Sequence, residues 1–127
     1  MSMDDEDQAR KLERILAKVR AEYGFIPTVS EVMSERPDVY IPYSEMSSSL
    51  FFKPRFMDRQ TAELAAISAG TALGSENCLN VHIVQALKLG VSEDAVLEAM
   101  LIGSLMSMNR SNSIAFRCLK AAKEGQK

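Results

Sequence analysis

The chain has 127 residues, a formal net charge of −2 and 25% charged residues, with no dense cluster of lysine and arginine. This length suits one domain with an apolar core, and the charge pattern argues against a nucleic-acid partner. No apolar run reaches the ~18 residues of a membrane-spanning helix, and the acidic start MSMDDEDQ is unlike a signal peptide. We therefore expect a single domain over residues 1–127, cytoplasmic, with no membrane partner.

Three helices are predicted in the amino-terminal half. Apolar residues recur at helical spacing over residues 4–23, and Gly24 follows as a stop signal. The sequence Thr28-Val29-Ser30-Glu31 matches a T-x-x-E capping box and predicts a short second helix. A third helix is predicted over residues 37–52, where Pro42 is early enough to be tolerated or to kink the helix.

Two helices are predicted around the middle of the chain. Asp58 is a suitable N-cap for a helix that ends at Leu73. Ser75 is then expected to cap the next helix, with its hydroxyl bonded to the backbone N–H of Cys78, and Gly90 ends that helix. These two helices contain the chain's only histidine and one of its two cysteines.

The carboxyl-terminal part predicts a helix that begins at Ser92 and is apolar on nearly all sides, as in AVLEAMLIGSLMSM. A last helix is expected over residues 111–123, with Cys118 in the core. No segment alternates with period two, so the fold class is all-α, a bundle of about six helices. Such an apolar helix leaves more hydrophobic surface than a monomer of this size can bury, which predicts a homo-oligomer.

Three side chains are candidates for chemistry. Cys78 and His82 are four residues apart, so on a helix their Cβ atoms lie about 5–6 Å apart on one face. Glu63 lies in the apolar sequence TAELAAISAGTA, where burial would make it a candidate proton carrier. A structural alternative exists for each: Cys78 and His82 could be core residues, and Glu63 could form a surface pair with Arg59.

Cys78 is the candidate nucleophile. It lies within the first turn of its predicted helix, where the helix dipole and free N–H groups favour a thiolate. Ser75, three residues earlier, can donate a hydrogen bond but cannot form a disulfide. One histidine and scattered carboxylates do not make a four-ligand metal set, so we expect no metal and no cofactor.

The order of these residues resembles the carboxymuconolactone decarboxylase and alkylhydroperoxidase D-like superfamily over roughly residues 22–122. The resemblance implies that Cys78 is a redox thiol, that Glu63 and His82 form its proton relay, and that the protein is a trimer or a hexamer. In the peroxidase branch a CxxC stands where this chain has Ser75 and Cys78. The serine is either natural or an engineered replacement.

Three functions are compatible with this pattern. The first is a thiol-dependent peroxidase or disulfide reductase that uses Cys78, His82 and Glu63, with an external thiol reductant or Cys118 resolving the oxidised cysteine. The second is decarboxylation of a lactone, with His82 and Glu63 as acid and base; against it, no arginine is close to His82 in the sequence. The third is an inactive binding protein, which Ser75 keeps open.

Overall fold

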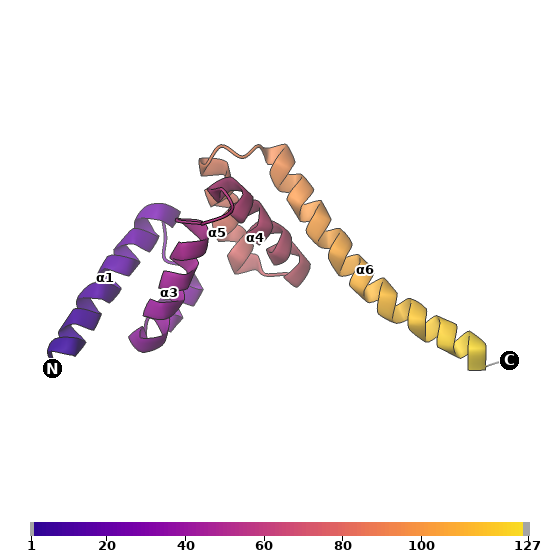
Figure 1. Ribbon diagram of the computed structural model, residues 1–127, viewed down its shortest axis with the longest axis horizontal. Helices are drawn as coiled ribbons and strands as arrows, with labels where there is room; N and C mark the ends of the chain where they lie inside the picture. The colour runs from indigo at the N-terminus through magenta and orange to yellow at the C-terminus, as the bar shows by residue number, and fades with distance from the viewer. Residues whose placement is uncertain (1, 126–127) are drawn as a thin grey trace.

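The computed structural model describes residues 2–125, which form six α-helices and no strand. In chain order these are α1 (Met3–Tyr23), α2 (Thr28–Met33), α3 (Pro37–Phe51), α4 (Arg59–Leu73), α5 (Glu76–Lys88) and α6 (Glu93–Gly125). They form an arch in which α1 and α3 make one arm, α4 and α5 lie at the centre, and α6 runs away on the other side (Figure 1). The predicted all-α class and the number of helices are confirmed.

The apolar core lies where α4, α5 and α6 meet. Ile67, Ala86, Val96 and Ala99 are buried there, and partly buried aliphatic side chains surround them. Gly103 of α6 is also buried, and its backbone passes close to α4. The core thus holds α4 and α5 in a fixed relation, and these are the helices that bear the candidate site.

The α1 arm is attached by partly buried apolar side chains and by polar contacts, and α1 has no fully buried residue. Lys11 forms an ion pair with Glu45 of α3 at 2.7 Å. The Gln85 side chain of α5 donates a hydrogen bond of 2.7 Å to the Glu22 carbonyl oxygen, and Lys88 donates another of 2.8 Å to the same oxygen. The end of α1 is therefore fixed to α5, while the rest of α1 lies along α3.

Helix ends follow the expected rules at several positions. Asp58 caps α4, and its carboxylate accepts a hydrogen bond of 2.7 Å from the Thr61 backbone N–H. Gly24 and Gly74 end α1 and α4 with φ of 80° and 67°, a region that favours glycine. The capping box at Thr28 was wrong: Pro27 is the N-cap and Thr28 is already helical, so no side chain caps α2.

The expected break before residue 111 was also wrong, because α6 is one helix of 33 residues. The polar stretch after Asn109 contains neither proline nor glycine, so nothing in it must interrupt a helix. The Ser111 hydroxyl instead donates a hydrogen bond of 3.3 Å to the Ser107 carbonyl oxygen, one turn earlier in the helix. As a result the end of α6 leaves the core, and Cys118, expected to be buried, is exposed.

The close approach of α6 to α4 gives a test of this packing. A Cβ atom added to Gly103 would collide with the Ser68 carbonyl oxygen and lie 3.1 Å from the Thr71 Cβ atom. We expect Gly103→Ala to lower the free energy of unfolding by about 1–3 kcal/mol, as overpacking does in cores. Urea unfolding followed by circular dichroism measures this change.

The matched control is Gly125→Ala in the same helix, where an added Cβ meets nothing within 4 Å. This control should leave the free energy of unfolding nearly unchanged or raise it slightly, because alanine favours helix. Equal destabilisation by both variants would show that the α4–α6 packing is looser than described.

Candidate active site

A buried carboxylate paired with a histidine forms the centre of the candidate site. Glu63 of α4 is 1% exposed, and its Oε2 atom lies 2.7 Å from Nδ1 of His82 on α5. With Glu63 as a carboxylate, which only accepts hydrogen bonds, Nδ1 is the donor and Nε2 is left to act as an acceptor. The expected burial of Glu63 is confirmed, and its partner is His82, not Arg59.

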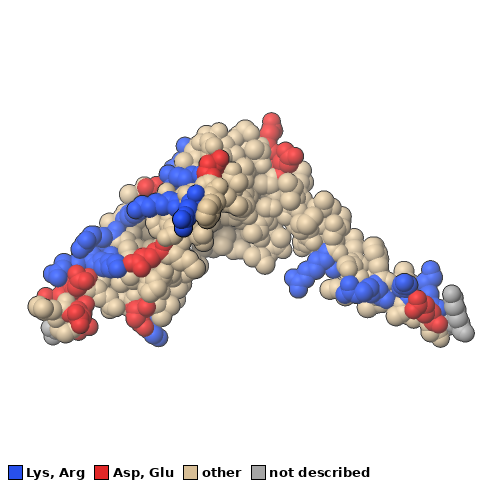
Figure 2. Space-filling model, in the orientation of Figure 1, with Lys and Arg blue, Asp and Glu red and all other residues tan. Residues whose placement is uncertain are grey.

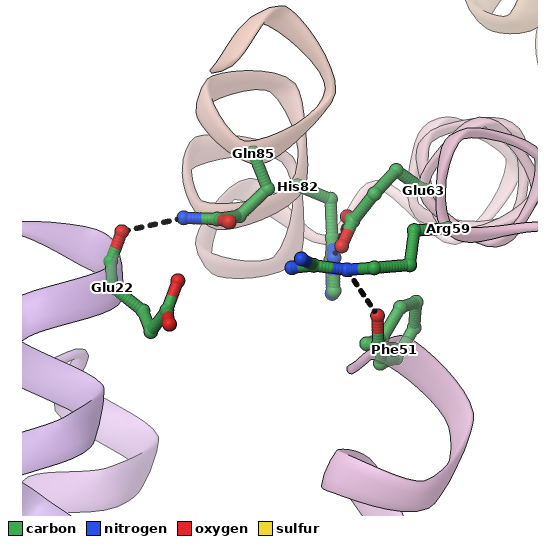
Figure 3. A network of polar contacts seen from close by, with 6 residues as sticks. All are labelled: Glu22, Phe51, Arg59, Glu63, His82 and Gln85. Carbon is green, nitrogen blue, oxygen red and sulfur yellow. Dashed lines mark hydrogen bonds and ion pairs between the residues drawn. The ribbon is translucent and has the colours of Figure 1, made fainter. Parts of the chain in front are cut away.

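The His82 ring is held from a second direction by Phe51, the last residue of α3. The two ring centroids are 4.5 Å apart with an angle of 36° between the planes. Arg59 also contacts Phe51, since its Nε donates a hydrogen bond of 3.1 Å to the Phe51 carbonyl oxygen. Figure 3 shows His82 and Arg59 in one network with Glu63 and Phe51.

No arginine is close to His82 in the sequence, but the fold brings Arg59 beside the site. Arg59 is four residues before Glu63 on α4, and its spacing suggested a pair with Glu63. Its guanidinium group instead lies over the Phe52 ring at 5.2 Å, and Lys18 lies 4.7 Å from the centroid of the same ring. Two cations therefore contact an aromatic residue beside the site, and only the tertiary fold brings them there.

Cys78 and His82 border the same pocket, which has a volume of about 240 Å³. Cys78 lies in the first turn of α5, as expected, and its side chain is exposed. No hydrogen bond joins Cys78 to His82 in the described part of the chain. A proton that passes between the two side chains therefore needs a water molecule or an oxygen of the ligand between them.

Ser75 is at the N-cap of α5, as predicted, but its hydroxyl makes no capping hydrogen bond. Its ψ is 92°, whereas Ser2 and Asp58, whose side chains cap α1 and α4, have ψ of 162° and 166°. The short connection explains this, because the Ser75 backbone N–H is already bonded to the Gly70 carbonyl oxygen at 2.8 Å. Ser75 is partly buried and does not line the pocket.

The chain also matches a known protein family. The model of the "Carboxymuconolactone decarboxylase family" matches residues 37–124, well over half of the chain. The chain belongs to the carboxymuconolactone decarboxylase family. Comparisons with curated proteins and with solved structures returned no match. The resemblance stated from the sequence is thereby confirmed.

The family match divides the pocket into two parts. Glu63, Cys78 and His82 all lie within the matched residues, whereas α1 and α2 precede them.

Within residues 2–125, no group of three or more histidine, cysteine, aspartate or glutamate side chains is arranged to hold a metal ion. In the same range, no helix has both the length and the apolarity to cross a membrane.

Tyr23 at the end of α1 is a site residue that the sequence analysis missed. It borders the pocket together with His82, and its ring stacks on Phe52 with centroids 6.3 Å apart. Burial raises the pKa of Tyr23 to about 12, and the negative charge of Glu63 contributes to the rise. Tyr23 thus keeps its proton at neutral pH and serves the site only as a neutral hydrogen-bonding group.

The raised pKa of Tyr23 predicts a loss of stability in alkaline solution. An unfolded tyrosine loses its proton near pH ~10. Between that pH and about 12, Tyr23 therefore keeps its proton in the folded protein but loses it in the unfolded chain. The Tyr23 contribution is complete below that window, and the free energy of unfolding falls as the pH rises through it. Urea unfolding at several pH values from about 9 to 11 should show a shallower decline for Tyr23→Phe than for the wild type. Parallel declines would contradict the assignment.

Proposed function

We propose that this member of the carboxymuconolactone decarboxylase family is a thiol-dependent redox enzyme that reduces a peroxide or a disulfide. One observation carries the proposal: an exposed thiol, Cys78, shares a pocket wall with a histidine whose second nitrogen is held by a buried carboxylate. The exposed thiol can contact a ligand in the pocket, and the Glu63–His82 pair can accept and return the proton of the thiol. A purely structural histidine would not need a pocket or a neighbouring thiol.

For a hydroperoxide the reaction divides into an attack and a reduction. The Cys78 thiolate attacks the terminal oxygen, the O–O bond breaks, and the alcohol leaves with a proton that His82 supplies. Cys78 becomes a sulfenic acid. A first external thiol then forms a mixed disulfide with Cys78 and releases water, and a second thiol displaces Cys78 and leaves as the reductant's disulfide.

The reductant in this proposal is an external thiol, because the chain offers no cysteine partner close to Cys78. Ser75 stands one helical turn before Cys78 and cannot form a disulfide. Cys118 is exposed near the end of α6, in the part that Figure 1 shows running away from α5. Within one chain, Cys118 is therefore badly placed to resolve Cys78.

Replacing each cysteine in turn tests the redox proposal. Cys78→Ser should reduce hydroperoxide consumption with dithiothreitol to the rate of the reductant alone, because the attacking thiolate is gone. Cys118→Ser is the matched control and should consume hydroperoxide at the wild-type rate. Mass spectrometry after dimedone treatment should find the sulfenic acid adduct on Cys78.

Two outcomes would count against this reading. Full peroxidase activity in Cys78→Ser would remove the thiol from the mechanism. Loss of activity in Cys118→Ser, with a bridge between Cys78 and Cys118 in non-reduced peptides, would show that Cys118 is the resolving residue.

Replacing His82 tests the proton relay separately. We expect His82→Ala to slow the reaction of Cys78 with hydroperoxide by about 10²-fold, the lower range for the loss of a general acid or base. Glu63→Gln should slow it less, because the amide oxygen still accepts a hydrogen bond from Nδ1 but carries no charge. Stopped-flow measurement of a single turnover gives both rates, and thermal unfolding serves as the control. If His82→Ala unfolds while its folded fraction reacts normally, His82 is a core residue.

The second candidate function is acid–base decarboxylation of a lactone by Glu63 and His82, with Cys78 only lining the pocket. The cations beside the site favour it: Arg59 and Lys18 flank Phe52, and Lys18 borders the pocket. A cation near the pocket suits a substrate carboxylate. A Cys78→Ser variant that decarboxylates a carboxylated lactone at the wild-type rate would favour this function; the binding-only alternative predicts neither activity.

We also propose that the protein is a homo-oligomer, a trimer or a hexamer, assembled through α6. Residues 99–109 of α6 carry no charge. Five large apolar side chains in that stretch are about half exposed: Leu101, Ile102, Leu105, Met106 and Met108. In Figure 2 the charged side chains lie on the α1 arm, along the top of the arch and at the far end of α6, and the lower side of the arch's centre is largely uncharged. A second copy of the chain would cover such a surface.

Light scattering tests the assembly. We expect a mass close to three or six times the 14.1 kDa of the chain at micromolar concentration. Leu105→Asp, on the exposed part of α6, should lower this mass because a charge in a buried apolar interface is costly. A stable wild-type monomer would remove the proposal.

A further inference from the structure

The pocket wall that faces α5 is made by α1, α2 and α3, and it contains all three tyrosines of the chain. Tyr23, Tyr40 and Tyr43 each border the pocket that also contains Cys78 and His82. The proposed mechanism gives these phenols no role. Three phenols in one pocket of a chain with three tyrosines call for a chemical explanation.

Tyr40 is the most informative of the three. Its side chain is only 1% exposed, and its hydroxyl makes no hydrogen bond with any residue of the described chain. Yet every fully buried polar side-chain atom in that range has a partner. The Tyr40 hydroxyl must therefore keep the little exposure that the residue has, and the open space beside it is the pocket. A buried phenol with a free hydroxyl at a pocket surface is a donor available to a ligand.

Tyr43 extends this polar patch toward the reactive thiol. Its ring centroid lies 6.1 Å from that of Tyr40, one helical turn away on α3. Tyr43 and Cys78 border the same pocket. Burial raises the pKa of Tyr43, and a negative charge on Cys78 would raise it further. Tyr43 therefore remains a neutral donor while Cys78 reacts.

The rest of this pocket wall combines apolar and polar side chains. Its apolar part consists of Ile15, Val19, Pro27, Val29 and Phe52, and its polar part consists of Lys11, Lys18, Glu45 and serines of α2 and α3. A ligand in the pocket can therefore place an apolar body against the first group and an oxygen toward the tyrosine hydroxyls. A small hydrocarbon that carries an oxygen acceptor has this combination.

We propose that Tyr40 and Tyr43 donate hydrogen bonds to an oxygen of a small hydrocarbon ligand and so hold that oxygen against Cys78. In the redox reaction, on which this inference rests for its substrate, the ligand is an organic hydroperoxide or its alcohol product. The two tyrosines then act as positioning and specificity-determining residues. They favour a ligand with an apolar body over hydrogen peroxide, because the body occupies the apolar part of the wall.

Binding can be measured without any reaction, because the chain contains no tryptophan. Its intrinsic emission comes from three tyrosines that all border the pocket, so quenching of this emission reports on ligand binding there. The probes are benzyl alcohol and toluene, which share an aromatic body and differ by one hydroxyl group. The proteins are the wild type, Tyr40→Phe, Tyr43→Phe and Ser49→Ala, whose hydroxyl is on α3 outside the pocket.

We expect a loss of binding affinity that depends on the hydroxyl group of the tyrosine and on the hydroxyl group of the probe. Tyr40→Phe should weaken benzyl alcohol binding about tenfold, the effect of one hydrogen bond of ordinary strength, and should leave toluene binding unchanged. Tyr43→Phe should act in the same direction, and Ser49→Ala should bind both probes as the wild type does. Equal weakening of both probes would mean that the tyrosines only shape the pocket, and unchanged binding of benzyl alcohol in both tyrosine variants would overturn the inference.

The two proposals can fail separately. If Tyr40→Phe does not fold, Tyr43→Phe decides by the same comparison. Suppose that the tyrosine variants bind benzyl alcohol more weakly but bind toluene normally, and that wild-type Cys78 does not react with cumene hydroperoxide. The ligand contact then stands, and the redox function is wrong. If wild-type Cys78 reacts with cumene hydroperoxide and both tyrosine variants bind benzyl alcohol normally, the redox function stands and the tyrosine inference falls.

Discussion

The hydrogen bond between Glu63 and His82 is the interaction on which the site depends. A carboxylate that is 1% exposed is costly to bury without a partner, and His82 Nδ1 at 2.7 Å is the partner that it has. Removing His82 would leave the Glu63 carboxyl group buried and without a partner, so the pair constrains the relative position of α4 and α5. The apolar core formed by Ile67 and Ala86 of the same two helices supports that position. The pair is thus a structural constraint, and because the proposed mechanism also uses it, experiments on it must measure stability and reactivity together.

The second wall of the pocket is held in a different way. Helix α1 contributes no fully buried residue, and its end is fixed to α5 by two hydrogen bonds to the Glu22 carbonyl oxygen, from Gln85 and Lys88. Gln85 is itself buried, so this contact is better protected from water than the exposed Lys11–Glu45 ion pair. The apolar residues of α1, among them Ile15 and Val19, are only partly buried, and a segment without buried side chains opens more easily than the core. The wall with Cys78 and His82 therefore belongs to a helix of the apolar core, and the wall with Ile15 and Val19 belongs to a segment outside it.

The parts of the site that follow from local rules were predictable from the sequence, and those that need tertiary contacts were not. Helical spacing alone places Cys78 and His82 on one face, and apolar neighbours alone indicate that Glu63 is buried. Asp58 was recognisable as a cap for the same reason. By contrast, Arg59 reaches Phe51 from a different helix, and the Ser75 hydroxyl misses its expected bond because the connection from α4 fixes the backbone. The continuous α6 was missed because a polar stretch resembles a break, although only proline or glycine would force one.

The position of the family match suggests how reactivity and selectivity are divided along the chain. The acid, the thiol and the histidine all lie within residues 37–124, whereas Tyr23 and the α1 residues of the pocket precede this range. The matched part can therefore provide the reactive groups, while the preceding helices complete the space that a ligand must fill. Tyr40 and Tyr43 lie near the start of the matched range, on the helix that α1 packs against. Under the proposed ligand contact, a change in α1 would alter which apolar body fits the pocket without touching the Glu63–His82 pair, as expected of a wall that selects ligands but does not react with them.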